Sequence, residues 1–268
     1  MAKVTVIMGI YNCADTLGAA LDSLLAQTFS DWNLVMCDDG SGDATYQIAE
    51  QYRAANPEKM TLIQNRRNMG LNHTLNRCLA LADGEYIARQ DGDDLSAPTR
   101  FEKEAALLDA RQDIAIVSTA MTFFDEEGTW GQSRPVEFPQ KTDFIAGTPF
   151  CHAPCMVRRE AYAAVNGYSE ESKYLRVEDY DLWVRMYARG FRGQNLPEPL
   201  YAMRDDRRAY SRRRFQYRIN EARVHIQAAR LLHLPAKAYL YALRPIAVGL
   251  LPERAYRALH KKRLEKRP

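Results

Sequence analysis

The fold is decided by residues 4–45, which read VTVIMGIYNCADTLGAALDSLLAQTFSDWNLVMCDDGSGDAT. Residues 4–10 form an apolar, mostly β-branched run, and residues 33–38 form a second apolar run. Between them, residues 16–27 repeat apolar side chains at helical spacing. A buried strand, a helix and another buried strand in this order predict two parallel strands joined by a crossover helix.

The same alternation continues to about residue 124. We expect helices at 45–55, 71–82 and 98–110, and strands at 60–65, 85–91 and 114–124. Residues 121–200 are less regular, apart from a helix at 178–190, and the chain after residue 211 is mainly helical. This order predicts an α/β fold with a mostly parallel central sheet of the kind that binds nucleotides.

Polar residues follow three of the expected strands. Tyr11 comes after the first strand, Asp39 after the second, and residues 91–94 after the fourth. In open α/β sheets, ligands bind outside the carboxyl ends of the strands. We therefore expect one crevice to collect all three groups.

Residues 89–94, RQDGDD, place three carboxylates within four positions directly after an apolar strand. A surface turn is one interpretation, because Asp and Gly favour turns. A divalent cation is the other. Asp91 and Asp93, two residues apart, point the same way from an extended strand, and their oxygens suit Mg²⁺ or Mn²⁺ that is also held by substrate phosphates.

Composition limits the compartment and the metal chemistry. The apolar runs are shorter than the roughly 20 residues of a transmembrane helix, and the N-terminus runs directly into the first strand, which argues against a signal peptide. The five cysteines indicate reduced thiols in a cytoplasm. Cys151 and Cys155 lack a second ligand pair for zinc.

Four ordered stretches resemble family 2 glycosyltransferases of the GT-A fold, and together they cover most of residues 3–204. They are residues 4–45, residues 68–94 followed by PTRFEK, residues 166–190 (NGYSEESKYLRVEDYDLWVRMYARG), and residues 196–204 (LPEPLYAMR). The resemblance implies a nucleotide-sugar donor, a divalent metal and transfer with inversion at the anomeric carbon.

The resemblance also implies donor-binding residues. Asp39 matches the carboxylate that accepts the uracil imide proton, and Tyr11 is placed against the base or ribose. Asn68 belongs to the loop that approaches the donor, although helix capping is an equal alternative. Asp91 and Asp93 match the DXD signature, with Asp93 as the direct ligand of Mg²⁺ or Mn²⁺. Arg204 matches the Arg of a block beside the donor; Arg207 and Arg208 depart from the family pattern there.

On the acceptor side, Asp179 matches the catalytic base. An inverting reaction needs a carboxylate on the face opposite the leaving diphosphate. Glu178 is the adjacent alternative and Asp181 a weaker one, and acids at a helix N-terminus also have a purely structural explanation. His152 lies in a block near the acceptor, where a structural histidine is equally consistent.

The end of the chain has a different character from the body. After residue 200 there are 18 Lys and Arg against 5 Asp and Glu, whereas the first 200 residues carry 19 against 29. We expect a domain at residues 1–204 and a basic helical extension at 205–268. Leu240, Leu243, Ala247 and Leu250 form an apolar stripe beside Lys237 and Arg244, the pattern of a helix on an anionic membrane. Packing on the body or self-association would also account for it.

Three functions are compatible with these features. The first is a metal-dependent inverting glycosyltransferase that moves a hexose-type sugar, with UDP as the expected nucleotide, to a glycan or lipid-linked acceptor in surface polysaccharide synthesis. The second is a nucleotidyltransferase that makes nucleotide sugars, but the first loop lacks a Gly-rich phosphate motif. The third is a module with a nucleic-acid-binding tail, but few aromatic residues lie among its arginines. The sequence favours the first, in the cytoplasm or on the inner face of the membrane, with no nucleic-acid partner.

Overall fold

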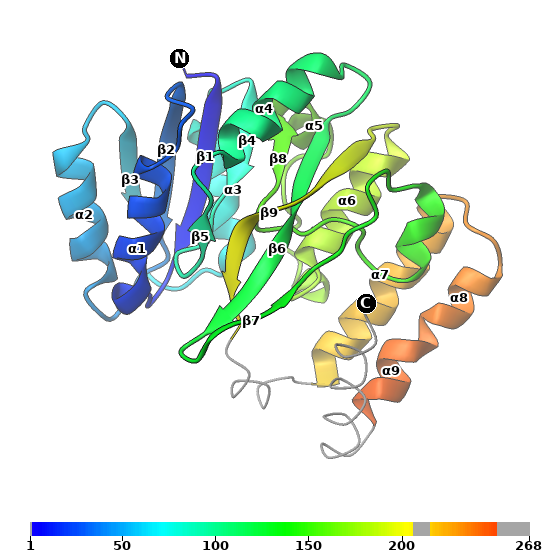
Figure 1. Cartoon of the computed structure of the whole chain (residues 1–268). Coiled ribbons are helices and arrows are strands. Elements are labelled where there is room, and N and C mark those ends of the chain that lie inside the picture. Colours follow the sequence, from blue (N-terminus) through cyan, green and yellow to red (C-terminus); the bar gives the residue numbers. More distant parts are fainter. Residues whose placement is uncertain (1, 206–214, 251–268) are drawn as a thin grey trace.

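The computed structural model describes residues 2–205 and 215–250. It has a central sheet with helices on both faces (Figure 1). The first half alternates strands and helices in this order: β1 (Val4–Ile10), α1 (Ala14–Leu25), β2 (Trp32–Asp38), α2 (Thr45–Ala55), β3 (Met60–Gln64), α3 (Leu71–Leu81), β4 (Tyr86–Arg89), β5 (Leu95–Ser96) and α4 (Arg100–Ala110). The expected alternation is therefore present.

The second half contains longer strands and the C-terminal helices. In order they are β6 (Ile116–Asp125), β7 (Gly128–Gln132), the 3₁₀ turn η1 (Lys141–Ile145), β8 (Met156–Arg158), α5 (Arg159–Ala164), η2 (Ser172–Tyr174), α6 (Glu178–Ala188), β9 (Gly193–Arg204), α7 (Phe215–Leu231), α8 (Lys237–Tyr241) and α9 (Leu243–Gly249). The helix predicted at 253–266 lies outside the described residues.

The strand order within the described residues is β3-β2-β1-β4-β8-β6-β9-β5, with β7 on β6. Strands β3, β2, β1 and β4 are parallel to one another, as are β6 and β9. β8 is antiparallel to both β4 and β6. The α/β prediction with a mostly parallel sheet and C-terminal helices is confirmed, and β8 is the strand that joins the two parallel parts.

Two apolar cores cover the two faces of the sheet, which explains why β1 is buried and apolar on both sides. On one face, Val4 and Val6 of β1 pack with helices α1, α2 and α4. On the other, Ile7 of β1 packs with α3, α6 and α7. Alternate residues of one strand thus enter opposite cores.

Helix α1 begins two residues earlier than predicted. The Ala14 amide donates to Asp43 Oδ2 at 3.2 Å, and the Cys13 amide donates to Thr45 Oγ1 at 2.8 Å. Acceptors from the β2–α2 loop therefore satisfy the first amides of the helix, which would otherwise lack partners. Because this cap comes from a distant part of the chain, local sequence could not place it.

Helix α7 packs on the body through small apolar side chains. Val224 and Ala228 are fully buried in the core that contains α6, whereas Phe215 and Ile226 are 44% and 48% exposed. The face thus uses small side chains close to the body. Where the chain divides into domains stays a prediction, but the start of the proposed extension shares a core with α6.

We predict that Val224→Ala lowers the free energy of unfolding by about 2 kcal/mol, because it removes two buried methyl groups and leaves a cavity. Ile226→Ala, on the exposed side of the same helix, should change the free energy of unfolding by less than about 0.5 kcal/mol. Chemical denaturation followed by tryptophan fluorescence measures both. If Val224→Ala left the unfolding transition unchanged, α7 and α6 would not share a core.

Candidate functional site

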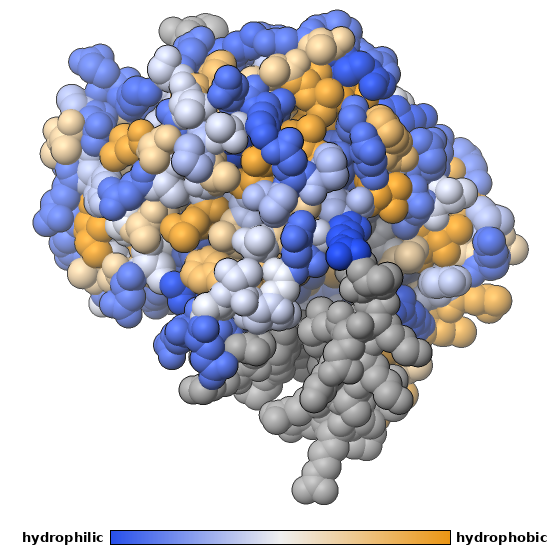
Figure 2. All heavy atoms as spheres, in the orientation of Figure 1, coloured by the Kyte–Doolittle hydropathy of each residue, from blue (hydrophilic) through white to orange (hydrophobic). Residues whose placement is uncertain are grey.

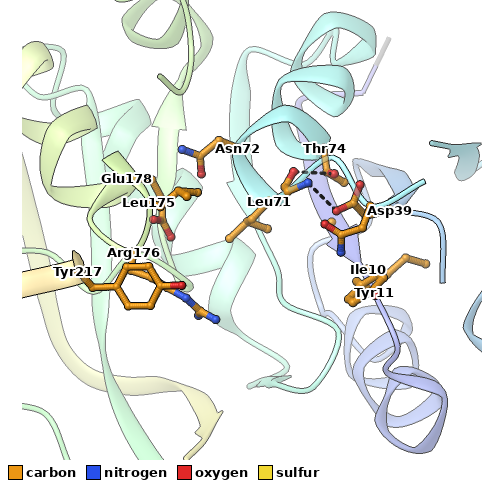
Figure 3. Close-up of a pocket in the computed structure, with 13 residues that line it drawn as sticks. Ile10, Tyr11, Asp39, Leu71, Asn72, Thr74, Leu175, Arg176, Glu178 and Tyr217 are labelled. Atoms are coloured by element: carbon orange, nitrogen blue, oxygen red, sulfur yellow. Dashed lines mark hydrogen bonds between the residues drawn. The ribbon is translucent and has the colours of Figure 1, made fainter. Parts of the chain in front are cut away.

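The site is built where the carboxyl ends of β1, β2 and β4 meet. Ile10 pairs with Asp38, the Asp39 amide donates to the Ile10 carbonyl at 2.9 Å, and the Gln90 amide donates to the Ile7 carbonyl. The loops after the three strands are thereby placed next to one another. A cavity of about 360 Å³ lies between the loops after β1 and β2, the start of α3, and helices α6 and α7 (Figure 3). Tyr11 and Asp39 line it, but residues 91–94, the third group expected in this crevice, do not.

Asp39 is buried in the wall of this cavity. Its carboxylate accepts the backbone amides of Met69 and Gly70 at 2.8 and 2.9 Å, and the Asn65 side-chain amide at 2.7 Å. It thus holds the start of α3, where the helix dipole favours a negative charge. Oδ2 has one of these three partners and keeps a lone pair for a ligand N–H.

Tyr11 and Asn68 flank Asp39 in the cavity wall. Tyr11 is 47% exposed, so its ring is free to contact a ligand. Asp38, by contrast, bonds to Ser41 and Gln64 and shapes the turn. The two adjacent aspartates therefore have different environments, and only Asp39 lines the cavity.

The turn at Gly40 sets the position of this loop. Gly40 has φ +71°, and a Cβ there would lie 2.7 Å from the Arg67 backbone. A side chain would thus collide with backbone as well as strain the turn. Glycine is what allows residues 67–70 to approach Asp39.

The loop after β4 carries the acidic cluster. Asp91 accepts from Arg89 Nη2 at 2.6 Å. The Asp93 side chain is exposed, and its pKa is raised by desolvation and by the negative charge of Asp91. Buried Asp94 accepts the Arg204 amide at 2.7 Å, and burial with its two acidic neighbours raises its pKa to about 8. Asp94 therefore fastens the loop to the end of β9, and Asp93 is left facing outward.

The acidic loop fits a cation that the substrate also helps to hold. The described residues contain no group of three or more His, Cys, Asp or Glu side chains that could enclose a metal, which also leaves Cys151 and Cys155 without a zinc site. Mg²⁺ needs only one or two protein carboxylates when phosphates complete its shell. Desolvation, followed by the charge of Asp91, raises the pKa of Asp93, and a bound cation would favour the ionised carboxylate.

Helix α6 supplies the carboxylates on the other side. Glu178 lines the cavity, and Asp179 follows it. Burial, followed by the charge of Glu178, raises the pKa of Asp179 to about 7, with Arg89 acting in the opposite direction. Asp181 is fully buried, paired with Arg185 at 2.8 Å and bonded to Gln227, so it belongs to the core. The weaker alternative for the base is therefore excluded.

His152 and Arg204 lie outside the cavity lining. His152 Nε2 is 2.9 Å from the Tyr168 hydroxyl, and its ring packs edge-on against Trp183. Burial, together with Arg89, holds its pKa well below the usual value, so the ring is neutral. The Arg204 guanidinium stacks over Phe124 and lowers the pKa of Asp93, which puts its charge beside the acidic loop.

Sequence reasoning missed three residues of the site. Arg89 is 5% exposed, pairs with Asp91, and acts electrostatically on Glu178 and Asp179. Arg176 has φ +66° and, with Tyr217 of α7, forms the wall opposite Asp39 (Figure 3). Arg89 was visible as a cation at the end of an apolar strand, but Tyr217 sits among arginines with no local signal.

The comparisons with known proteins agree with this geometry. The sequence model described as "Glycosyl transferase family 2" matches residues 5–165. The chain is 45% identical over 262 residues to the putative glycosyltransferase EpsE of Bacillus subtilis, covering 98% of this chain and 94% of that protein. It is 27% identical to WfaP of Escherichia coli, a UDP-Glc:alpha-D-GlcNAc-diphosphoundecaprenol beta-1,3-glucosyltransferase, covering 73% and 74% of the two chains.

Solved structures show the same architecture. TarS (residues 1–349) of S. aureus in complex with UDP superposes with TM-score 0.70 at 19% identity, covering 96% of this chain and 78% of that one. The mannosyltransferase PcManGT from Pyrobaculum calidifontis, in complex with GDP-Man and Mn²⁺, superposes with TM-score 0.68 at 22% identity, covering 100% and 81%. The fold is that of the GT-A glycosyltransferases. The chain belongs to glycosyl transferase family 2.

We predict that Gly40→Ala weakens UDP binding at least tenfold, because its Cβ displaces residues 67–70 from Asp39. Gly128→Ala is the matched control. It also has a positive φ, but nothing lies within 4 Å of its Cβ position, so it should lose stability and keep UDP affinity. Calorimetric titration with UDP and Mn²⁺ compares the two, and equal affinities would refute the role of the Gly40 contact.

Proposed function

We propose that this glycosyltransferase moves a hexose-type sugar from a UDP-linked donor to a hydroxyl of a glycan or lipid-linked acceptor, with inversion at the anomeric carbon. The observation that carries the proposal is one cavity with Tyr11, Asp39 and Asn68 on one side and Glu178 on the other, beside the loop of Asp91 and Asp93. A nucleotide-binding end and a second acidic end are what sugar transfer needs.

In this proposal, Asp39 accepts the imide N–H of uracil and Tyr11 lies against the base or ribose. Asn68 and Arg204 contact the rest of the donor. Asp39 can act only as an acceptor when ionised, which suits an N–H donor. The use of UDP is supported by the printed activity of WfaP and by the UDP complex of TarS.

Asp93 is the proposed ligand of Mg²⁺ or Mn²⁺, with Asp91 beside it. A cation bound there would neutralise charge on the leaving diphosphate. Mn²⁺ in the PcManGT complex supports this assignment. Arg89 holds the Asp91 carboxylate in place through their 2.6 Å ion pair, whereas Asp93 has no such pair with Arg89.

Asp179 is the proposed base. It takes the proton of the acceptor hydroxyl while that oxygen forms a bond to the anomeric carbon on one face. The bond from this carbon to the diphosphate oxygen breaks on the opposite face, and its electron pair leaves with the diphosphate. A carboxylate with a pKa of about 7 is a stronger base than an ordinary aspartate and is still ionised in half of the molecules at neutral pH.

A lipid-linked acceptor in surface polysaccharide synthesis is supported by the relative WfaP, which by its name acts on a diphosphoundecaprenol acceptor. Such an acceptor would place the enzyme at the inner face of the membrane. No helix in the described part of the chain is long and apolar enough to cross a bilayer. The nucleotidyltransferase and nucleic-acid alternatives gain no support from the family match.

We predict that a screen of nucleotide sugars with Mn²⁺ or Mg²⁺ gives donor hydrolysis with a UDP-sugar, and that excess EDTA abolishes it. Asp93→Asn should lose the same activity, because a neutral amide is a poor ligand for a hard cation. Glu58→Gln, a remote exposed acid, is the control for a change of charge. Full activity in EDTA would eliminate the metal, and full activity in Asp93→Asn would eliminate this ligand.

We predict that Asp179→Asn lowers kcat by about 10²- to 10⁴-fold and leaves UDP affinity nearly unchanged, because it removes only the proton acceptor. Asp181→Asn should instead lower the melting temperature, since it breaks the buried pair with Arg185.

The pH dependence tests the same assignment. The base works when deprotonated, so kcat/KM should rise with pH below about 7 and level off above it. The rise should be absent in Asp179→Asn. Loss of UDP binding in this variant, or a retained rise, would assign Asp179 a structural role.

A further inference from the structure

Helices α8 and α9 expose their large apolar side chains and bury their small ones. Leu240, Leu243 and Leu250 are 68%, 63% and 71% exposed, and Ala247 is exposed between them. Ala242, which joins the two helices, is itself helical at φ −61° and ψ −22°, so these positions lie along one face. We call this set of four residues the leucine face.

The opposite side of α8 and α9 packs on α7 through small residues. Ala238, Ala242 and Pro245 are buried there. A Cβ on Gly249 would lie 3.0 Å from Phe215 and Arg218 of α7, so the two helices are in close contact. If packing on the body were the purpose of the leucines, they would occupy these positions. Their outward direction indicates a partner beyond the described residues.

The charges around the leucine face are of one sign. From residue 222 to residue 250 there are no Asp or Glu residues, and the four cations are Arg223, Arg230, Lys237 and Arg244. All four are exposed. Tyr239 and Tyr241 are also exposed beside the leucines. Figure 2 shows apolar surface at the right, where Figure 1 places α8.

The sequence that follows the leucine face adds to the same charge. Residues 251–268 contain seven Lys and Arg and two Glu. Leucines flanked by tyrosines and cations, without acids, match the chemistry of the boundary between acyl chains and anionic head groups. A protein partner of ordinary composition gives no reason for the complete absence of acids over residues 222–250.

We infer that the leucine face of α8 and α9 docks the enzyme on an anionic lipid bilayer, with the leucines among the acyl chains and Lys237 and Arg244 at the head groups. Docking rests on the proposed function, because it serves catalysis only if the acceptor is lipid-linked. Helix α7, on which α8 and α9 pack, also carries Tyr217 into the cavity. Docking would thus hold one wall of the site close to a lipid-linked acceptor.

The test uses the full-length protein and sedimentation with phosphatidylcholine vesicles, with and without phosphatidylglycerol. We expect binding to the anionic vesicles that weakens with added salt, because salt screens the basic side chains. The double variant Leu240→Glu/Leu243→Glu should bind at least tenfold more weakly. Leu81→Glu, an exposed leucine at the end of α3, is the matched control and should bind like the unchanged protein.

UDP titration shows that each variant is folded, and Leu240→Ser/Leu243→Ser replaces the double variant if that test fails. The vesicle result needs no donor or acceptor, so it stands apart from any failure of the transferase assay. Three results would overturn the inference: no sedimentation of the unchanged protein with anionic vesicles, equal binding by the double variant, or a dimer of the unchanged protein that the double variant converts to a monomer without vesicle binding.

Discussion

The fully buried guanidinium of Arg100 is the contact on which the site depends. It donates to the Arg89 carbonyl at 2.9 Å, to Ser96 Oγ at 2.9 Å and to Gln90 Oε1 at 3.3 Å. Gln90 in turn donates to the carbonyls of Asp91 and Asp94. The Arg100 Nε also donates to Glu104 Oε2 at 3.2 Å, and burial raises the pKa of that carboxyl to about 8. One side chain of α4 thereby fixes the backbone on both sides of the acidic loop.

Arg89 acts on the site through its charge, whereas Arg100 acts through hydrogen bonds to the backbone and side chains of the loop. Burial alone would lower the pKa of Arg89, but the negative charge of Asp91 acts in the opposite direction, and the pKa of Arg89 is raised. The same guanidinium lowers the pKa of Asp179 against the effect of burial, and it adds to the burial that holds the pKa of His152 low. The carboxylates of the loop and of α6 therefore share the buried positive charge of Arg89, which reduces the repulsion that two acidic groups in one cleft create.

The sequence predicted the alternating elements because each strand is a buried apolar run with a periodic helix beside it. It also singled out Asp39 and Glu178, which line the cavity, and Asp91, which pairs with Arg89, since these residues follow strands or begin a helix. It did not find Tyr217, because only the packing of α7 on α6 brings that residue to the cavity. The sequence predicted the apolar stripe of Leu240 and Leu243 but not that this stripe faces solvent. The small residues Ala238 and Ala242, which recur on the opposite side of the helices and are buried, could have indicated which side packs on the body.

The position of β9 has a consequence for how the molecule is made. The Ala97 amide donates to the Leu200 carbonyl, and Asp94 accepts from Arg204, 110 residues away in sequence. On the ribosome, β1 to β4 can pair once Arg89 has emerged, whereas the acidic loop is fastened only after Arg204 has emerged. Closing so long a segment is slow compared with forming local contacts. The part of the cleft around Asp39 can therefore form before the acidic loop is fastened, and the loop reaches its final position among the last steps of folding.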